Sequence, residues 1–155
     1  MAVVALLRHG ITKWNLEGRI QGSQDEPLSD AGKAKLCGLL LPQPYATWPA
    51  FVSPLRRARE TAALLGIAAK VEPRLREMAW GAYEGRLLPE LRAETGAFAE
   101  NEARALDFRP PDGESPREVQ QRALLFLADI AKASENAVAV THKGVIRALL
   151  AAAHG

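Results

Sequence analysis

The chain has 155 residues, of which 48% are hydrophobic and 25% are charged, and 20 Lys and Arg against 18 Asp and Glu give a formal net charge of +2. This length and composition suit one folded domain and exclude a disordered chain. No apolar run approaches the roughly 18 residues that span a bilayer, and no N-terminal segment has the length of a signal-peptide core. We therefore expect a cytoplasmic protein without a membrane partner. The small charge surplus also predicts no nucleic-acid partner, and the single cysteine, Cys37, excludes an internal disulfide.

Short apolar segments alternate with amphipathic segments along the chain. In chain order the sequence predicts a strand at 2–7, a helix from Ser29 to about Leu40, a strand at 50–52, a helix at about 54–65 capped by Ser53, a strand at 68–71, a helix that begins at the Ser115/Glu118 capping box, a strand at 137–140 and a helix at 145–153. Between them, residues 78–112 lose this periodicity and predict an excursion with one or two exposed helices that covers the active site. The alternation predicts a single α/β domain over residues 1–155, a three-layer α/β/α sandwich with a mostly parallel central sheet.

Polar clusters follow three of the four predicted strands. They are Arg8-His9, Ser53 to Arg56, and Thr141-His142. The carboxyl ends of parallel strands meet at one edge, where ligands bind. A neutral imidazole is a nucleophile toward phosphorus, and arginines clamp phosphoryl oxygens, so the clusters indicate phosphoryl chemistry. A strand-end histidine is, however, more often a hydrogen-bonded structural residue, and Arg56 to Arg59 is equally compatible with a solvated helix face.

Several blocks of sequence, spread over nearly the whole chain, occur in the order in which a known protein family has them. They are Arg8-His9-Gly10-Ile11-Thr12-Lys13-Trp14-Asn15, then 18–22, 27–29, 53–58, 75–77, 81–85, 113–115 and 141–147. In this order they resemble the histidine phosphatase superfamily, also called the phosphoglycerate mutase-like family. The resemblance implies the same α/β fold as the segment pattern.

The resemblance also implies roles for individual residues. His9 would be the nucleophile that takes the phosphoryl group as a phosphohistidine, and Arg8, Arg56 and His142 would bind the phosphoryl oxygens. Glu77 would protonate the leaving alcohol and then activate water, which requires a carboxyl group with a raised pKa. The family needs no metal or cofactor, so none is expected here.

Five further residues are expected to bind substrate: Thr12, Asn15, Gln21, Gly22 and Lys143. Lys143 stands where the family usually has a small residue, and its amine either adds charge to the phosphate pocket or faces solvent. Met78-Ala79-Trp80 follows Glu77 where an acidic or polar residue is frequent, which predicts a more apolar leaving-group side.

Two features favour a phosphatase over a mutase. Family mutases hold the substrate carboxylate partly with two adjacent arginines after the general acid, whereas the four arginines between Glu77 and Glu114 are all separated from one another. Gln21, before Gly22, also resembles the phosphatase members. The sequence therefore predicts a metal-independent phosphatase acting on a small organic phosphomonoester, with α-ribazole phosphate or a sugar phosphate as examples. Phosphoglycerate mutase is the alternative, and a catalytically silent domain that binds a phosphorylated ligand is the second. A homodimer is compatible with the sequence.

Overall fold

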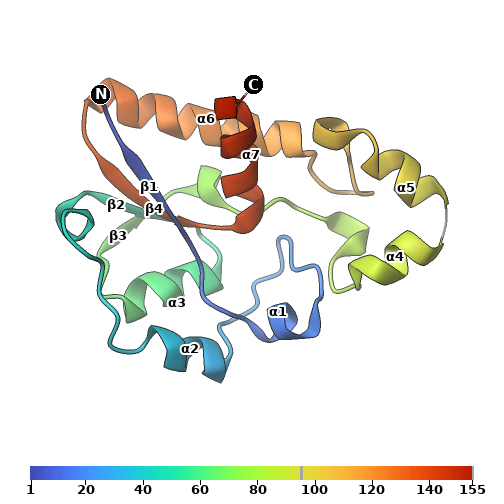
Figure 1. The fold of residues 1–155 in the computed structure, drawn as a ribbon, viewed down its shortest axis with the longest axis horizontal. Helices are drawn as coiled ribbons and strands as arrows, with labels where there is room; N and C mark the ends of the chain where they lie inside the picture. The colour runs from blue at the N-terminus through green and yellow to red at the C-terminus, as the bar shows by residue number, and fades with distance from the viewer. Residues whose placement is uncertain (95, 155) are drawn as a thin grey trace.

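A four-stranded parallel sheet forms the centre of the protein, as shown by the computed structural model, which describes residues 1–94 and 96–154 (Figure 1). The strands are β1 (Val4–Arg8), β2 (Ala50–Val52), β3 (Ala69–Val71) and β4 (Ala137–Thr141), in the spatial order β1-β4-β2-β3. All three pairings are parallel, which confirms the predicted α/β class. Thr95 of the predicted excursion and Gly155 at the end of the predicted domain lie outside the described residues.

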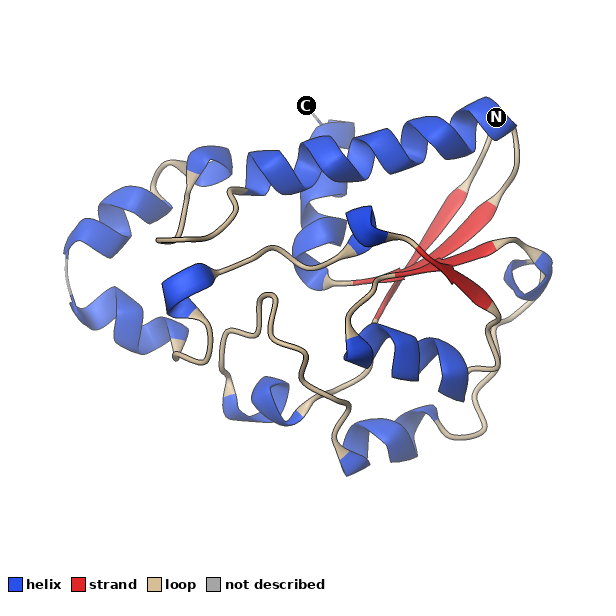
Figure 2. Ribbon diagram, turned by 180° about the vertical axis from the view of Figure 1, so that it is seen from behind, coloured by secondary structure: helices blue, strands red, loops and turns tan. Residues whose placement is uncertain are grey.

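Helices cover both faces of this sheet (Figures 1 and 2). One layer holds α6 (Pro116–Ala133) and α7 (Lys143–His154), and the other holds α2 (Asp30–Leu36) and α3 (Arg56–Leu64). Successive strand residues point to opposite faces, so Ala139 packs with Phe126 of α6 while the next residue, Val140, packs with Ala58 of α3. The fold therefore has the three layers expected from the sequence.

The starts of α6 and α3 show one predicted cap that is confirmed and one that is wrong. At α6 the capping box forms as predicted: the Ser115 hydroxyl accepts from the Glu118 amide, and the Glu118 carboxylate accepts from the Ser115 amide at 2.8 Å. The prediction for α3 is wrong, because this helix begins at Arg56 and its N-cap residue is Leu55, not Ser53. The Arg56 amide instead donates to the side chain of Asp25 at 2.6 Å. Ser53 is thereby left for a different partner, described below.

Residues 78–112, where one or two helices were expected, contain two, α4 (Leu88–Glu94) and α5 (Gly96–Glu102), with 3-10 turns η3 (Gly81–Tyr83) and η4 (Ala105–Asp107) at their sides. These helices are not simply exposed. Leu91 and Phe98 are 2% and 3% exposed and belong to one apolar cluster with Val119 of α6 and Val145 of α7. The excursion is therefore anchored to the same side of the sheet as the two C-terminal helices.

The remaining elements are short: α1 (Lys13–Glu17), η1 (Tyr45–Thr47) and η2 (Pro73–Leu75). The helix predicted to extend to about Leu40 ends at Leu36, and the one predicted from 145 begins at Lys143. Among the helices described, none is both long and apolar enough to cross a bilayer.

Candidate active site

The pairing of β1 with β4 brings the two strand-end histidines together. Their register places Arg8 opposite Thr141, and the His9 amide donates to the Thr141 carbonyl at 3.0 Å. The residues that follow, His9 and His142, consequently have ring centroids 5.1 Å apart. Both side chains are buried, at 7% and 0% exposure. Two imidazoles from opposite ends of the sequence thus share one site, because their strands are neighbours.

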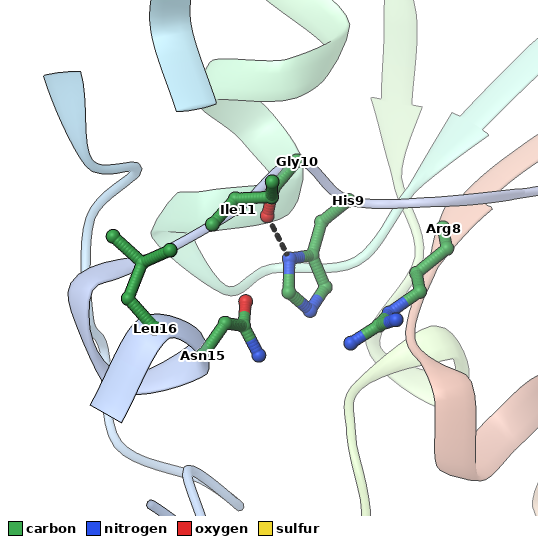
Figure 3. A pocket seen from close by; sticks show the side chains of 6 residues that line it. All are labelled: Arg8, His9, Gly10, Ile11, Asn15 and Leu16. Carbon is green, nitrogen blue, oxygen red and sulfur yellow. Dashed lines mark hydrogen bonds between the residues drawn. The ribbon is translucent and has the colours of Figure 1, made fainter. Parts of the chain in front are cut away.

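The His9 ring is held in one tautomer. Its Nδ1 lies 2.6 Å from the carbonyl oxygen of Gly10 (Figure 3). A carbonyl oxygen can only accept, so Nδ1 carries the proton and Nε2 carries the free lone pair. The Gly10 amide in turn donates to the Thr61 hydroxyl of α3 at 2.9 Å, which fixes the loop. Burial lowers the pKa of His9 to about 4, with the nearby charges of Arg57 and Arg8 acting in the same direction, so the ring is neutral at pH 7.

The second imidazole is positioned by Ser53. His142 Nε2 lies 2.7 Å from the Ser53 hydroxyl oxygen, while its Nδ1 is buried and has no hydrogen-bond partner among the described residues. Burial holds the pKa of His142 well below its usual range, and the positive charge of Arg57 acts in the same direction. His142 is therefore also neutral at pH 7. Ser53, expected to cap a helix, instead orients this ring.

The structure places Arg57, not Arg56, at the site. Arg56 points outward, where its guanidinium pairs with Glu60 at 2.7 Å. Arg57 is 1% exposed and lines the cavity beside His9, and its two terminal nitrogens donate to the carbonyls of Gln24 and Gly22 at 2.6 and 2.8 Å. Its Nε is buried without a partner in the part of the chain that is described. The placement of Arg56 as a phosphoryl ligand is thus corrected.

The carboxyl group of Glu77 lies at the start of α7. Its two oxygens accept hydrogen bonds from the amides of Met78 at 2.9 Å and Gly144 at 3.2 Å. A Cβ atom at Gly144 would overlap the Glu77 carboxylate, so this close approach requires glycine. Burial raises the pKa of Glu77 and outweighs the two amides and the charge of Arg57, which favour the carboxylate. Arg122, which no sequence signal singled out, donates to the Glu77 carbonyl at 3.2 Å and holds this segment on α6.

A cavity of about 770 Å³ opens beside these groups, and a smaller one of about 300 Å³ meets it at Arg8, His9 and Asn15. Seven of the ten predicted site residues line the larger cavity: Arg8, His9, Asn15, Gln21, Gly22, Glu77 and Lys143. Figure 3 shows the Arg8 guanidinium and the Asn15 amide on either side of the His9 ring. The apolar wall includes Met78 and Trp80, as expected from the residues after Glu77.

Thr12 does not reach the cavity. It is completely buried, and its hydroxyl donates to the side-chain oxygen of Gln21 at 2.7 Å and lies 3.1 Å from that of Asn15. The amide of Thr12 also donates to Asn15, which closes a capping box at the start of α1. Thr12 therefore positions two lining residues rather than contacting a ligand in the cavity, and the prediction that it binds substrate directly is corrected.

The parallel sheet, its helical layers and the strand-end site define an α/β protein of the phosphoglycerate mutase-like class. The family model of the histidine phosphatase superfamily (branch 1) matches residues 4–155, and the chain belongs to this superfamily.

The relatives to which this chain is similar are named for different activities. The chain is 33% identical to 2,3-bisphosphoglycerate-dependent phosphoglycerate mutase 2 of Gloeobacter violaceus, over 97% of this chain and 74% of that protein. It is 34% identical to an acid phosphatase of Mycobacterium tuberculosis, over 94% and 72% respectively. The crystal structure of TTHB049 from Thermus thermophilus superposes with a TM-score of 0.78 at 41% identity, over 95% of this chain and 82% of that one. The chain spans 60% to 74% of the length of the curated relatives.

Proposed function

We propose that this protein is a phosphomonoester phosphatase that acts through a phosphohistidine on His9. The observation that carries the proposal is the fixed tautomer of His9, whose neutral ring presents Nε2 beside the charges of Arg8 and Arg57. A neutral imidazole with a free lone pair attacks phosphorus without a metal to activate it.

In this proposal two buried nitrogen atoms donate hydrogen bonds to the phosphoryl oxygens. Arg57 Nε and His142 Nδ1 have no partner within the described residues, although buried polar groups are nearly always hydrogen-bonded. When the Ser53 hydroxyl donates to His142 Nε2, the ring proton lies on Nδ1, so both atoms donate to an anion. Arg8 and Asn15 flank His9 and complete the contacts (Figure 3). Donors fixed before the substrate arrives stabilise the charge that develops on the phosphoryl oxygens.

Glu77 moves the protons in both halves of the reaction. In the first half the Nε2 lone pair forms a bond to phosphorus, the bond to the alcohol oxygen breaks, and Glu77 gives its proton to that oxygen. In the second half Glu77 takes a proton from water, the water oxygen attacks phosphorus, and the bond to His9 breaks to release inorganic phosphate. The raised pKa of Glu77 keeps a larger protonated fraction available for the first half.

The arginines of the excursion support a phosphatase over a mutase. Arg86 pairs with Glu94, Arg92 with Glu102 and Arg109 with Glu118, so these guanidinium groups are already engaged by carboxylates. The fourth arginine, Arg104, donates only to the side chain of Asn101 at 3.5 Å, and no two arginines adjoin in the described part of the excursion, which therefore offers no adjacent pair for a phosphoglycerate carboxylate. We propose a small organic phosphomonoester as substrate, of which α-ribazole phosphate and sugar phosphates are examples, and a cytoplasmic location.

The deciding experiment is hydrolysis of para-nitrophenyl phosphate with excess chelator by three proteins. The wild type is expected to turn over, His9→Ala to lose about 10⁴-fold or more in kcat, and His154→Ala to match the wild type, since His154 is exposed at the end of α7. Intact mass after rapid quenching is expected to show a phosphorylated protein only when His9 is present. Loss of turnover with chelator, or wild-type rates in His9→Ala, would overturn the mechanism.

Phosphoglycerate mutase is the second candidate, because relatives are named as mutases. Incubation with 3-phosphoglycerate and a catalytic amount of the bisphosphate separates the two activities. We expect phosphate release to outpace formation of the isomer. The reverse result would replace the phosphatase with a mutase, and binding without any turnover would indicate the catalytically silent alternative.

A further inference from the structure

Two positively charged side chains of α7 line the larger cavity without a counter-ion. They are Lys143 and Arg147, four residues apart and so on the same side of the helix, and both are exposed. Neither takes part in an ion pair with any residue of 1–94 or 96–154. Both are therefore available to a ligand in the cavity.

The other cations toward the mouth of the same cavity are already engaged. Arg19 pairs with Glu17 at 2.7 Å and donates to the Gly85 carbonyl at 2.7 Å. Arg92 pairs with Glu102, whose carboxylate also lines the cavity and is neutralised by that contact. Among the described residues that line this cavity, the unpaired positive charge outside the phosphoryl site is thus concentrated on α7.

The position of Lys143 relates this charge to one end of the substrate. Lys143 lies between His142 and Gly144, whose amide holds the carboxyl group of Glu77. In the proposed reaction Glu77 protonates the leaving oxygen, so Lys143 stands at the leaving-group end. Arg147 lies about 6 Å farther along α7, which is the rise of four helical residues. A substrate whose alcohol part extends along α7 meets both charges.

The cavity also has an apolar wall that suits a carbon framework. Trp80 and Phe108 have ring centroids 5.3 Å apart, and both line the cavity together with Leu88 and Leu106. An alcohol part that fills this space has apolar surface to bury.

We propose that Lys143 and Arg147 form a second anion-binding site, which selects phosphomonoesters whose alcohol part is partly apolar and carries a carboxylate or a second phosphate. This inference rests on the proposed function, because Glu77 defines the leaving-group end. Lys143 and Arg147 act on specificity, and they do not take part in bond breaking.

The test compares para-carboxyphenyl phosphate with para-methylphenyl phosphate, which differ mainly in one negative charge. The measured quantity is the selectivity ratio, the kcat/KM of the charged ester divided by that of the neutral ester, so changes at the shared phosphoryl site cancel. Lys143→Met and Arg147→Met are each expected to lower this ratio about threefold, and the double variant about tenfold, as for partly exposed charge pairs. A para-phosphonophenyl phosphate probe shows whether a second phosphate-like group is preferred to the carboxylate.

Lys35→Met is the matched control, because it removes one exposed lysine of α2 that lines neither cavity. It is expected to keep the wild-type ratio. Raising the ionic strength is expected to lower the ratio for the wild type and to leave that of the double variant almost unchanged. A double variant with the wild-type ratio would overturn the inference.

A binding measurement separates this inference from the proposed reaction. Calorimetry with His9→Ala compares para-carboxybenzyl phosphonate with para-methylbenzyl phosphonate, and it requires no turnover. If neither ester is hydrolysed by the wild type but the carboxylated phosphonate binds more tightly through Lys143 and Arg147, the proposed reaction fails and the anion site stands. If both esters are hydrolysed and the substitutions change neither selectivity nor binding, the anion site fails and the reaction stands.

Discussion

Adjacent arginines on α3 provide an internal comparison of a buried and an exposed guanidinium. Arg57 is 1% exposed and donates to two carbonyls, at Gly22 and Gln24, whereas Arg56 lies at the surface and pairs with Glu60. Substitution of each by Met removes the same charge and a similar side-chain length. We expect Arg57→Met to lower kcat/KM about 10²- to 10³-fold, the usual loss for one fixed donor to a developing oxyanion. For Arg56→Met we expect a change of about threefold or less, because an exposed pair contributes about 0.2–1 kcal/mol.

Stability must be measured beside activity, since Arg57 also holds the turn at 22–24. Two carbonyls left without a donor cost about 1–3 kcal/mol each, so Arg57→Met is expected to lose about 2–6 kcal/mol of the free energy of unfolding. Urea denaturation gives this loss, and kcat/KM is then compared for the folded fraction alone. Arg57→Lys retains the charge and separates charge from geometry. If Arg56→Met lost as much kcat/KM as Arg57→Met, the assignment of Arg57 to the phosphoryl site would be wrong.

Three further perturbations test single contacts of the site. The kcat/KM is expected to rise as the pH increases through about 4, where His9 loses its proton, and to fall at higher pH as Glu77 loses its proton. If the rise instead occurred near the ordinary histidine pKa of about 6.5, it would contradict the burial of His9. Gly144→Ala pushes a Cβ atom into the Glu77 carboxylate, so it is expected to slow esters of alkyl alcohols far more than para-nitrophenyl phosphate, and equal losses would count against Glu77 as the acid. Ser53→Ala removes the partner of His142 and is expected to cost about tenfold in kcat/KM, the equivalent of about 1.4 kcal/mol, with recovery in Ser53→Thr; an unchanged Ala variant would show that the ring is positioned without it.

The strands and the strand-end histidines could be predicted because their signals are local. A buried parallel strand is a continuous apolar run, and the residues after it reach the carboxyl edge whatever the rest of the chain does. The capping box joins Ser115 and Glu118, which are only three positions apart, and it formed as predicted. The apolar side of the cavity was likewise visible in the residues after Glu77.

Which arginine reaches the site, Arg56 or Arg57, depends on which side of α3 faces the protein interior. Its buried positions are Arg57, Ala58, Thr61 and Ala62, so the spacing from the apolar residues indicates the second arginine. A helix that began two residues earlier with Ser53 as its cap was expected, whereas α3 begins at Arg56 after Leu55. The actual partner of Ser53, His142, is 89 positions away, and no local pattern reveals such a contact. Thr12 was misplaced for a similar reason, since its buried hydroxyl is hydrogen-bonded to Gln21, nine positions away.

Helix α3 supports two separate parts of the site. The Thr61 hydroxyl accepts a hydrogen bond from the Gly10 amide, and the Gly10 carbonyl fixes the tautomer of His9. One turn earlier on the same helix, Arg57 lines the cavity. A small rigid displacement of this helix would therefore loosen His9, the proposed nucleophile, and withdraw the charged side chain of Arg57 at the same time. Grafting the two histidines onto another parallel sheet would require this helix to be grafted with them, in the same position relative to the strands. The smallest portable unit for the pair is consequently four segments, the neighbouring strands β1, β4 and β2 with Ser53 at the end of β2, and the helix α3, and not a set of side chains.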